Sequence, residues 1–160
     1  MNYDGIIIGG GPAGLYCAIH AARSGSKVLL LERNSRLGKK LLITGKGRCN
    51  VTNHCPSEEV LQNIPRNSRF LFSALRTHSP ADVEAFFEAQ GCPLKVERGN
   101  RVFPVSDRAQ SVLDALKGAL KRAGVTVIND RVRLLSLDDG VVTGVKGQKD
   151  SYQADWVILA

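Results

Sequence analysis

The chain of 160 residues has 43% hydrophobic content and 16 glycines, which is enough to bury one core of ordinary domain size. No apolar run approaches the length of a membrane span, and the amino terminus lacks the basic region of a secretory signal, so we expect a cytoplasmic protein. The net charge is +7, and the segment from 33 to 57 contains six basic residues and no acid. That local concentration suits a small polyanion such as a pyrophosphate better than a long duplex, with a solvated basic loop as the alternative.

The first 32 residues predict a βαβ unit. An apolar run from Tyr3 to Ile8 leads into glycines and then into apolar residues at helical spacing, which are Leu15, Ala18, Ile19 and Ala22. Gly25 ends the predicted helix. A second apolar run, Lys27 to Glu32, is typical of a buried parallel strand.

Helices and a polar stretch follow. We expect an irregular segment from 53 to 67 and a helix from 69 to 76. Ser79-Pro80-Ala81-Asp82 indicates the start of another helix, with Val83, Phe86 and Phe87 buried and Gly91 as its end. Ser106 is expected to cap the next helix, which continues to Gly124.

The remainder predicts strands at 125–128, 132–137, 141–146 and 154–160, with an Asp139-Gly140 hairpin turn. The last run is typical of a buried parallel strand, and such a strand feeds a loop or helix that the sequence does not contain. We therefore expect an amino-terminal part of a longer protein, with no domain boundary inside residues 1–160.

The four cysteines form no C-x-x-C pair, and the three histidines have no partner at ligand spacing. Free thiols and no metal site are the expectation.

Gly9-x-Gly11-x-x-Gly14 matches the dinucleotide-binding pattern between the first strand and the first helix. Gly9 permits the tight turn, Gly11 lets the backbone approach a pyrophosphate, and Gly14 lets the helix pack closely on the sheet. The helix N-terminus then offers N–H groups to the anion. The alternative is a glycine turn without a ligand.

Glu32 ends the second strand, where its carboxylate can accept hydrogen bonds from the adenosine ribose. Its charge would repel a 2′-phosphate, which disfavours NADP at this site. A P-loop is absent, because Gly45-Lys46 is followed by Gly47 instead of Ser or Thr.

The segment from Gly38 to Asn53, together with the glycine motif, Glu32 and Arg101-Val102-Phe103-Pro104, resembles a bacterial FAD-dependent flavoprotein family. That family includes aminoacetone oxidase and 3-dehydro-bile-acid reductase. The resemblance implies an α/β fold: a Rossmann-like FAD-binding domain with a parallel sheet, helices on both faces and a small antiparallel β-meander. It also implies an inserted second domain and a C-terminal FAD segment outside this sequence.

By this resemblance, the cofactor is FAD and thirteen positions contact it. The pyrophosphate would be held by Gly9, Gly11, Pro12, Ala13 and Gly14. The adenosine half would be met by Glu32 and Arg33, with Lys39 and Lys40 near the ribose or phosphate and the Val132 backbone at the adenine. The ribityl chain and ring would be met by Gly47, Arg48 and Asn50.

Two of these side chains have alternative roles. Arg48 can supply a forked donor to phosphate or a flavin carbonyl, or it can pair with an acid in the core. Asn50 can be a turn residue. Cys49 and Cys55 raise the possibility of a disulfide reductase, but five residues separate them in a loop-like composition, so we expect unpaired thiols.

The leading hypothesis is an FAD-dependent oxidoreductase that moves a hydride between the flavin and a small organic substrate, with NAD(P)H as a candidate electron donor. The alternatives are an NAD-dependent dehydrogenase and a non-catalytic dinucleotide-binding or RNA-associated flavoprotein module. No catalytic acid or base is identified, and neither a membrane nor a nucleic-acid partner is expected.

Overall fold

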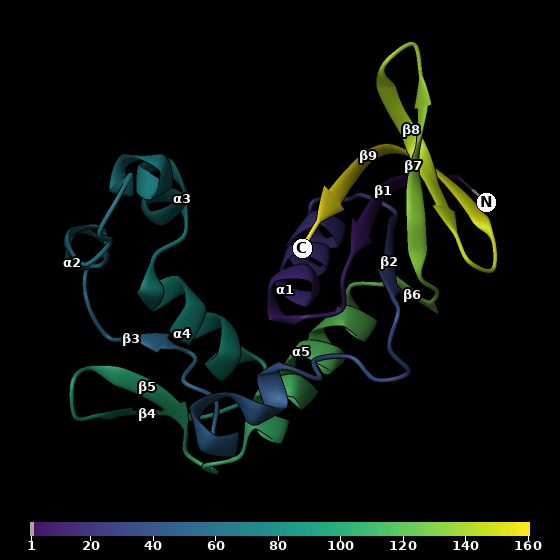
Figure 1. The fold of residues 1–160 in the computed structure, drawn as a ribbon. Helices are drawn as coiled ribbons and strands as arrows, with labels where there is room; N and C mark the ends of the chain where they lie inside the picture. The colour runs from purple at the N-terminus through teal and green to yellow at the C-terminus, as the bar shows by residue number, and fades with distance from the viewer. Residues whose placement is uncertain (1) are drawn as a thin grey trace. The chain divides into compact units, whose positions relative to one another are not determined.

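The computed structural model describes residues 2–160 (Figure 1). Strands from both ends of the chain form a six-stranded mixed sheet. Its strand order is β6-β2-β1-β9-β8-β7. The four parallel strands are β1 (Asn2–Ile8), β2 (Val28–Glu32), β6 (Thr126–Asn129) and β9 (Ser151–Leu159). Strands β7 (Val132–Asp138) and β8 (Val141–Gly147) extend the sheet in antiparallel fashion. This arrangement confirms the predicted α/β fold with an antiparallel meander.

The chain divides into two compact units, one formed by residues 2–41 and 116–160 and the other by 42–115. The first unit contains the six-stranded sheet and α1 (Pro12–Arg23). The second contains β3 (Thr52–Asn53), β4 (Leu94–Glu97) and β5 (Arg101–Pro104), which form an antiparallel sheet in the order β3-β5-β4. Helix α5 (Ala109–Arg122) carries the chain from the second unit back to the first.

The second unit also contains short helices. These are α2 (Ser57–Gln62), α3 (Phe72–Thr77), α4 (Pro80–Ala89) and the 3-10 segments Leu41–Gly47 and Ser68–Leu71. The first 3-10 segment is interrupted at Thr44–Lys46, where Gly45 and Lys46 adopt left-handed backbone angles with φ of 54° and 57°.

One core of the first unit lies on a face of the large sheet. Every residue of β2 is buried, as expected for a strand with neighbours on both sides. Ile6, Leu29 and Leu31 pack with residues of β8 and β9, among them Val145 and Tyr152. Because side chains alternate along a strand, Ile7 and Leu30 point to the opposite face, and both are fully buried. Helix α1 contacts β1 and β2 and buries Leu15, Ala18 and Ile19, as predicted.

Several predicted elements need correction. The segment 53–67 is not irregular throughout, because it contains part of β3 and all of α2. Strands β4 and β5 form at 94–104, where no strand was expected. In β4, Val96 is 49% exposed, so this strand lacks the apolar alternation that signals strands. Ser106 does not cap α5 directly: the helix begins at Ala109, and the Ser106 hydroxyl accepts the N–H of Arg108.

The last strand is parallel to β1, as predicted, but it begins at Ser151 and is not buried along its length. Leu159 is 83% exposed, so the apolar character of this run does not reflect burial by the described residues 2–160. Trp156 packs instead on Gly5 of β1, where a β-carbon would overlap the indole ring. Glycine at position 5 therefore makes room for the tryptophan.

Candidate functional site

The turn between β1 and α1 depends on glycine at two positions for internal reasons. Gly9 has φ of 117°, and a β-carbon there would meet the carbonyl of Ala160. A β-carbon on Gly14 would meet the carbonyl of Gly9. Both glycines are therefore needed for the close approach of β1, β9 and α1, whatever ligand the turn holds.

Gly11 differs from these two glycines because no contact within the protein requires a glycine at this position. A β-carbon on Gly11 would have no heavy atom within 4 Å, and its φ of −77° is open to any residue. The glycine leaves open space where α1 begins. Open space of this kind fits a ligand that approaches the backbone closely, such as a pyrophosphate.

The first turn of α1 is free of competing groups. Its N-cap residue is Gly11, which gives no side-chain cap, Pro12 follows at the first helical position, and no acid lies in the first turn. The N–H groups of Ala13 and Gly14 have no partner within the helix by its geometry. These amides, at the positive end of the helix dipole, can bind an anion.

The Glu32 carboxylate lies beside the glycine turn. It is 8% exposed, and its Oε2 accepts a hydrogen bond from the Gly10 N–H at 2.6 Å. Its Oε1 accepts from the backbone N–H and the side-chain Nδ2 of Asn34, at 2.7 and 2.6 Å. A carboxylate offers about four acceptor positions, so one is left for a ribose hydroxyl. Asn34 belongs to no sequence motif and was not among the predicted site residues.

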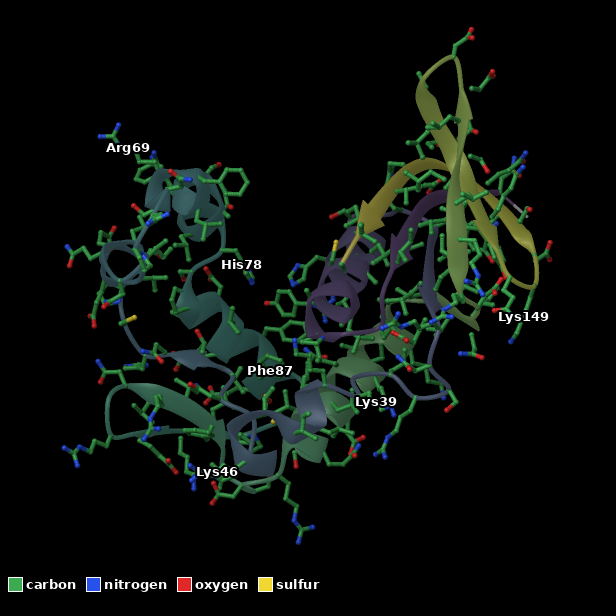
Figure 2. The ribbon with its side chains drawn as sticks, in the orientation of Figure 1. Lys39, Lys46, Arg69, His78, Phe87 and Lys149 are labelled. Atoms are coloured by element: carbon green, nitrogen blue, oxygen red, sulfur yellow. The ribbon has the colours of Figure 1, made fainter. Side chains whose placement is uncertain are left out.

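The basic residues after β2 are tied to the glycine turn through one backbone hydrogen bond. The N–H of Gly38 donates to the carbonyl of Gly10 at 2.8 Å. Lys39, labelled in Figure 2, and Lys40 follow directly and are exposed, as is Arg33. The structure thus places predicted site residues from two segments of the first unit close to one turn.

Val132 also belongs to the first unit, at the start of β7. It is half-buried and packs against the core around Ile6 and Leu29. Its strand follows β6, which pairs with β2 in a register that places Asn129 opposite Glu32. The predicted adenine contact therefore lies three residues beyond the partner of Glu32.

The other three predicted site residues lie in the second unit, and two of them have partners there. Arg48 forms ion pairs with Glu97 at 2.8 Å and Asp107 at 3.1 Å, and its guanidinium lies 4.1 Å from the centre of the Phe103 ring. The hydrogen bond that Arg48 donates to Glu97, followed by the one that it donates to Asp107, raises the pKa of Arg48. The alternative of an arginine paired with acids is thus the arrangement that the structure shows.

Asn50 and Gly47 both have a role in the backbone structure of the second unit. The Asn50 Nδ2 donates to the carbonyls of Thr52 and Val102, at 2.7 and 3.1 Å, and so links β3 to β5. Gly47 has φ of 84°, in the left-handed region that favours glycine. Contacts of these residues with the flavin stay a prediction.

The four cysteines are free thiols. Burial raises the pKa of Cys49 and of Cys92, and it also raises the pKa of Cys55, where Glu59 and Glu84 add to the effect. A raised pKa keeps a thiol protonated and weakly nucleophilic. Redox chemistry by Cys49 and Cys55 therefore has no support from their surroundings.

Within residues 2–160, no three His, Cys, Asp or Glu side chains gather closely enough to hold a metal ion. Over the same residues, every helix falls short of the length and apolarity that crossing a bilayer requires.

The chain is similar to curated proteins along much of its length. It is 38% identical to the 3-dehydro-bile acid delta(4,6)-reductase of Clostridium scindens over 164 residues, which cover all of this chain and 39% of the relative. It is 32% identical to the ribosomal RNA dihydrouridine synthase of Escherichia coli over 125 residues, covering 78% of this chain and 30% of the relative. The chain therefore spans well under half the length of these relatives.

Among solved structures, the 3-ketosteroid-delta4-(5alpha)-dehydrogenase of Rhodococcus jostii RHA1, in complex with 4-androstene-3,17-dione, has the same fold. The TM-score is 0.75 at 17% identity, covering 99% of this chain and 45% of that one. The model of the HI0933-like protein Rossmann domain matches residues 3–160, nearly the whole sequence. The chain therefore belongs to the HI0933-like family of FAD-binding Rossmann proteins.

Proposed function

We propose that this chain binds FAD as the amino-terminal portion of the FAD-binding domain of an oxidoreductase. In this proposal the cofactor's diphosphate lies at the turn from Gly9 to Gly14. The whole protein transfers a hydride between the flavin and a small organic substrate. Bound FAD supplies the redox chemistry, and the protein supplies binding and orientation.

The observation that carries the proposal is the open space beside Gly11 at an uncapped helix N-terminus. Glu32 supports it with an acceptor position at the end of the neighbouring strand. The exposed Lys39 and Lys40 can add positive charge next to the same turn. Together these groups provide amides and cations for a diphosphate and a carboxylate for a ribose.

The remaining predicted roles belong to this proposal. Arg33 and the Val132 backbone would contact the adenosine half, and Gly47, Arg48 and Asn50 would approach the ribityl chain and ring. For Arg48 this role requires the ligand to share or replace the carboxylates of Glu97 and Asp107. We further propose NAD(P)H as the electron donor and the cytoplasm as the location, where free thiols persist.

The curated relatives are a reductase and a synthase of a dihydro product, and the structural neighbour is a dehydrogenase. These names describe enzymes that add or remove hydrogen. They do not favour the alternatives of an NAD-dependent dehydrogenase or a non-catalytic module. They support a substrate with a bond that can be saturated or desaturated.

The substitution Gly11→Val tests the proposal. Because a β-carbon at this position meets no protein atom, we expect the variant to fold normally, whereas its isopropyl group would fill the space beside the helix N-terminus. FAD affinity, followed by quenching of flavin fluorescence, should fall at least about tenfold.

The control is Gly118→Ala in α5, where the new methyl group would meet only the end of the Arg122 side chain. This variant should bind FAD as the original chain does. An unaltered FAD affinity in Gly11→Val would contradict the proposed site, and no FAD binding by the original chain would contradict the proposed function.

A further inference from the structure

The orientation of the Glu32 carboxylate is set by asparagine residues outside the glycine motif. Asn34 donates two hydrogen bonds to Oε1, from its backbone N–H and from Nδ2, and Gly10 donates one to Oε2. Glu32 as a residue is 8% exposed, so these bonds are largely shielded from water. Three donors on a short side chain leave it little rotational freedom.

A second asparagine holds the backbone on both sides of Arg33. Asn129 ends β6 opposite Glu32 in the parallel register. Its Nδ2 donates to the carbonyl of Glu32 at 2.9 Å and to that of Asn34 at 2.7 Å. The Asn129 amide therefore fixes the backbone of Glu32. It also fixes the backbone of Asn34, which orients the Glu32 carboxylate.

Lys149 in turn orients the amide of Asn129. It lies in the turn between β8 and β9 (Figure 2), and its Nζ donates to the Asn129 carbonyl at 2.7 Å and to Oδ1 at 3.3 Å. Because an ammonium group only donates, the oxygen of the amide faces Lys149 and the NH₂ group faces the two carbonyls. The turn between β8 and β9 thereby fixes the direction in which the Asn129 side chain donates its hydrogen bonds.

We propose that Asn34 and Asn129 are positioning residues for the adenosine ribose. They hold Glu32 so that one acceptor position stays available to a ribose hydroxyl, and they thereby set the affinity for ligands with an unsubstituted ribose. This inference rests on the proposed function, because it requires an adenine dinucleotide at the glycine turn. Substituting either asparagine should weaken binding through the ribose alone.

The test compares ADP with 2′,3′-dideoxy-ADP, which lacks both ribose hydroxyls, by calorimetric titration of the chain. The original chain should prefer ADP. In Asn34→Ala, ADP affinity should fall about tenfold, the size expected for a lost hydrogen bond to a charged group. In Asn129→Ala, which loses two hydrogen bonds to the carbonyls that hold Glu32 and Asn34 in place, it should fall by a similar factor. Affinity for the dideoxy compound should change less than about twofold, because that compound gives Glu32 nothing to bind.

Two further variants keep a folding defect from imitating this result. In Asn34→Ser the hydroxyl can still donate to Oε1, so most of the ADP affinity should return. In Asn63→Ala the lost bond is one to the Glu59 carbonyl on exposed α2, and neither nucleotide should be affected. Unfolding midpoints of all variants, measured without ligand, report the structural cost separately.

Equal weakening of both nucleotides would overturn the inference, since the asparagines would then act on the fold and not through the ribose. No weakening of ADP would overturn it as well. Suppose that either of these two results is found, but the original chain binds FAD and Gly11→Val binds it more weakly. Then only this inference fails, and the proposed function stands. If the original chain binds neither FAD nor ADP, the proposed function fails and the inference fails with it.

Discussion

Asp130 is the buried acid on which the turn between β8 and β9 depends. It is 3% exposed, and its carboxylate accepts hydrogen bonds from five groups. These are the backbone N–H groups of Arg131, Gln148, Lys149 and Asp150 and the hydroxyl of Tyr152. A β-carbon on Gly147 would overlap the same carboxylate. Because Lys149 also holds Asn129, this acid supports the end of β6 beside Glu32.

Burial and hydrogen bonding move the pKa values of Asp130 and Tyr152 in opposite directions. Desolvation acts to raise the pKa of Asp130, but the hydrogen bonds, led by those from Arg131 and Tyr152, bring it below its usual value. Burial, followed by the hydrogen bond to Asp130, raises the pKa of Tyr152 to about 12. The charged acid and the neutral phenol are thus the forms that the fold stabilises.

We therefore predict a pH-dependent effect of Asp130→Asn. A carboxyl group whose pKa is lowered by folding stabilises the protein above its unfolded pKa of about 3.9, and this contribution disappears as the pH falls through the folded pKa. At pH 7 the substitution should lower the free energy of unfolding by roughly 2 kcal/mol. In urea unfolding, the difference from the original chain should shrink below about pH 4.

Asp155→Asn on β9, at an exposed position, is the matched control and should leave stability nearly unchanged at either pH. An Asp130→Asn effect of equal size at pH 7 and pH 3 would contradict the role given to the charge.

At the scale of elements, α4 begins where its sequence predicts, although Val83 of its predicted buried side is only half-buried. Ser79 accepts the N–H of Asp82, and the Asp82 carboxylate accepts the N–H of Ser79 at 2.7 Å, which completes a capping box. Pro80 occupies the first helical position, and Phe86 and Phe87 are buried in edge-to-face contact. The hydrogen bonds from Ser79 lower the pKa of Asp82. Local chemistry and burial therefore agree on where this helix begins.

The expected cost of removing this cap is that of an ordinary helix N-cap. Ser79→Ala should lower the free energy of unfolding by about 1 kcal/mol, because the N–H of Asp82 loses its acceptor. Denaturant unfolding measures the change, and amide exchange near Asp82 should quicken. Ser73→Ala, at an exposed position inside α3, should cause no loss, since alanine favours a helix interior. A larger loss in Ser73→Ala than in Ser79→Ala would contradict this account.

At the scale of the whole molecule, the glycine turn, Glu32 and the Asn129 network all belong to the first unit, which residues from both ends of the chain build. Parallel pairing of β1 with β2 and β9, and of β2 with β6, brings the carboxyl ends of these strands to one edge of the sheet. In open α/β sheets ligands bind at this edge. The position of the candidate site thus follows from strand order as well as from the motif.

This arrangement predicts that stabilisation requires the adenosine half of the cofactor. FAD at about a hundred times its dissociation constant should add roughly 2.7 kcal/mol, which for a chain of this size raises the melting temperature by about 5–10 °C. FMN has neither the adenosine nor the diphosphate bridge, so it should raise the melting temperature by less than about 1 °C. Thermal unfolding with each ligand at equal concentration provides the measurement. Equal shifts with FMN and FAD would contradict the placement of the adenosine half beside Glu32.

The sequence alone determined the βαβ unit, the packing roles of Gly9 and Gly14, and the hairpin turn at Asp139-Gly140, whose φ values are 47° and 81°. These features depend on neighbours in the chain: apolar periodicity, positive φ and the spacing of glycines around a helix start. The resemblance of residues 38–53 identified the family. Local sequence patterns therefore predicted the fold class, and the family resemblance predicted the cofactor.

Tertiary structure decided which polar groups meet. Asn129 reaches Glu32 across 97 residues, Tyr152 reaches Asp130 across 22, and Arg48 meets Glu97 across 49. No local pattern encodes these pairs, because the strand register of the folded sheets sets each distance. Strands β4 and β5 pair with each other across only three residues, but β4 lacks a regular apolar alternation, and the pairing of β5 with the distant β3 is decided by the tertiary structure.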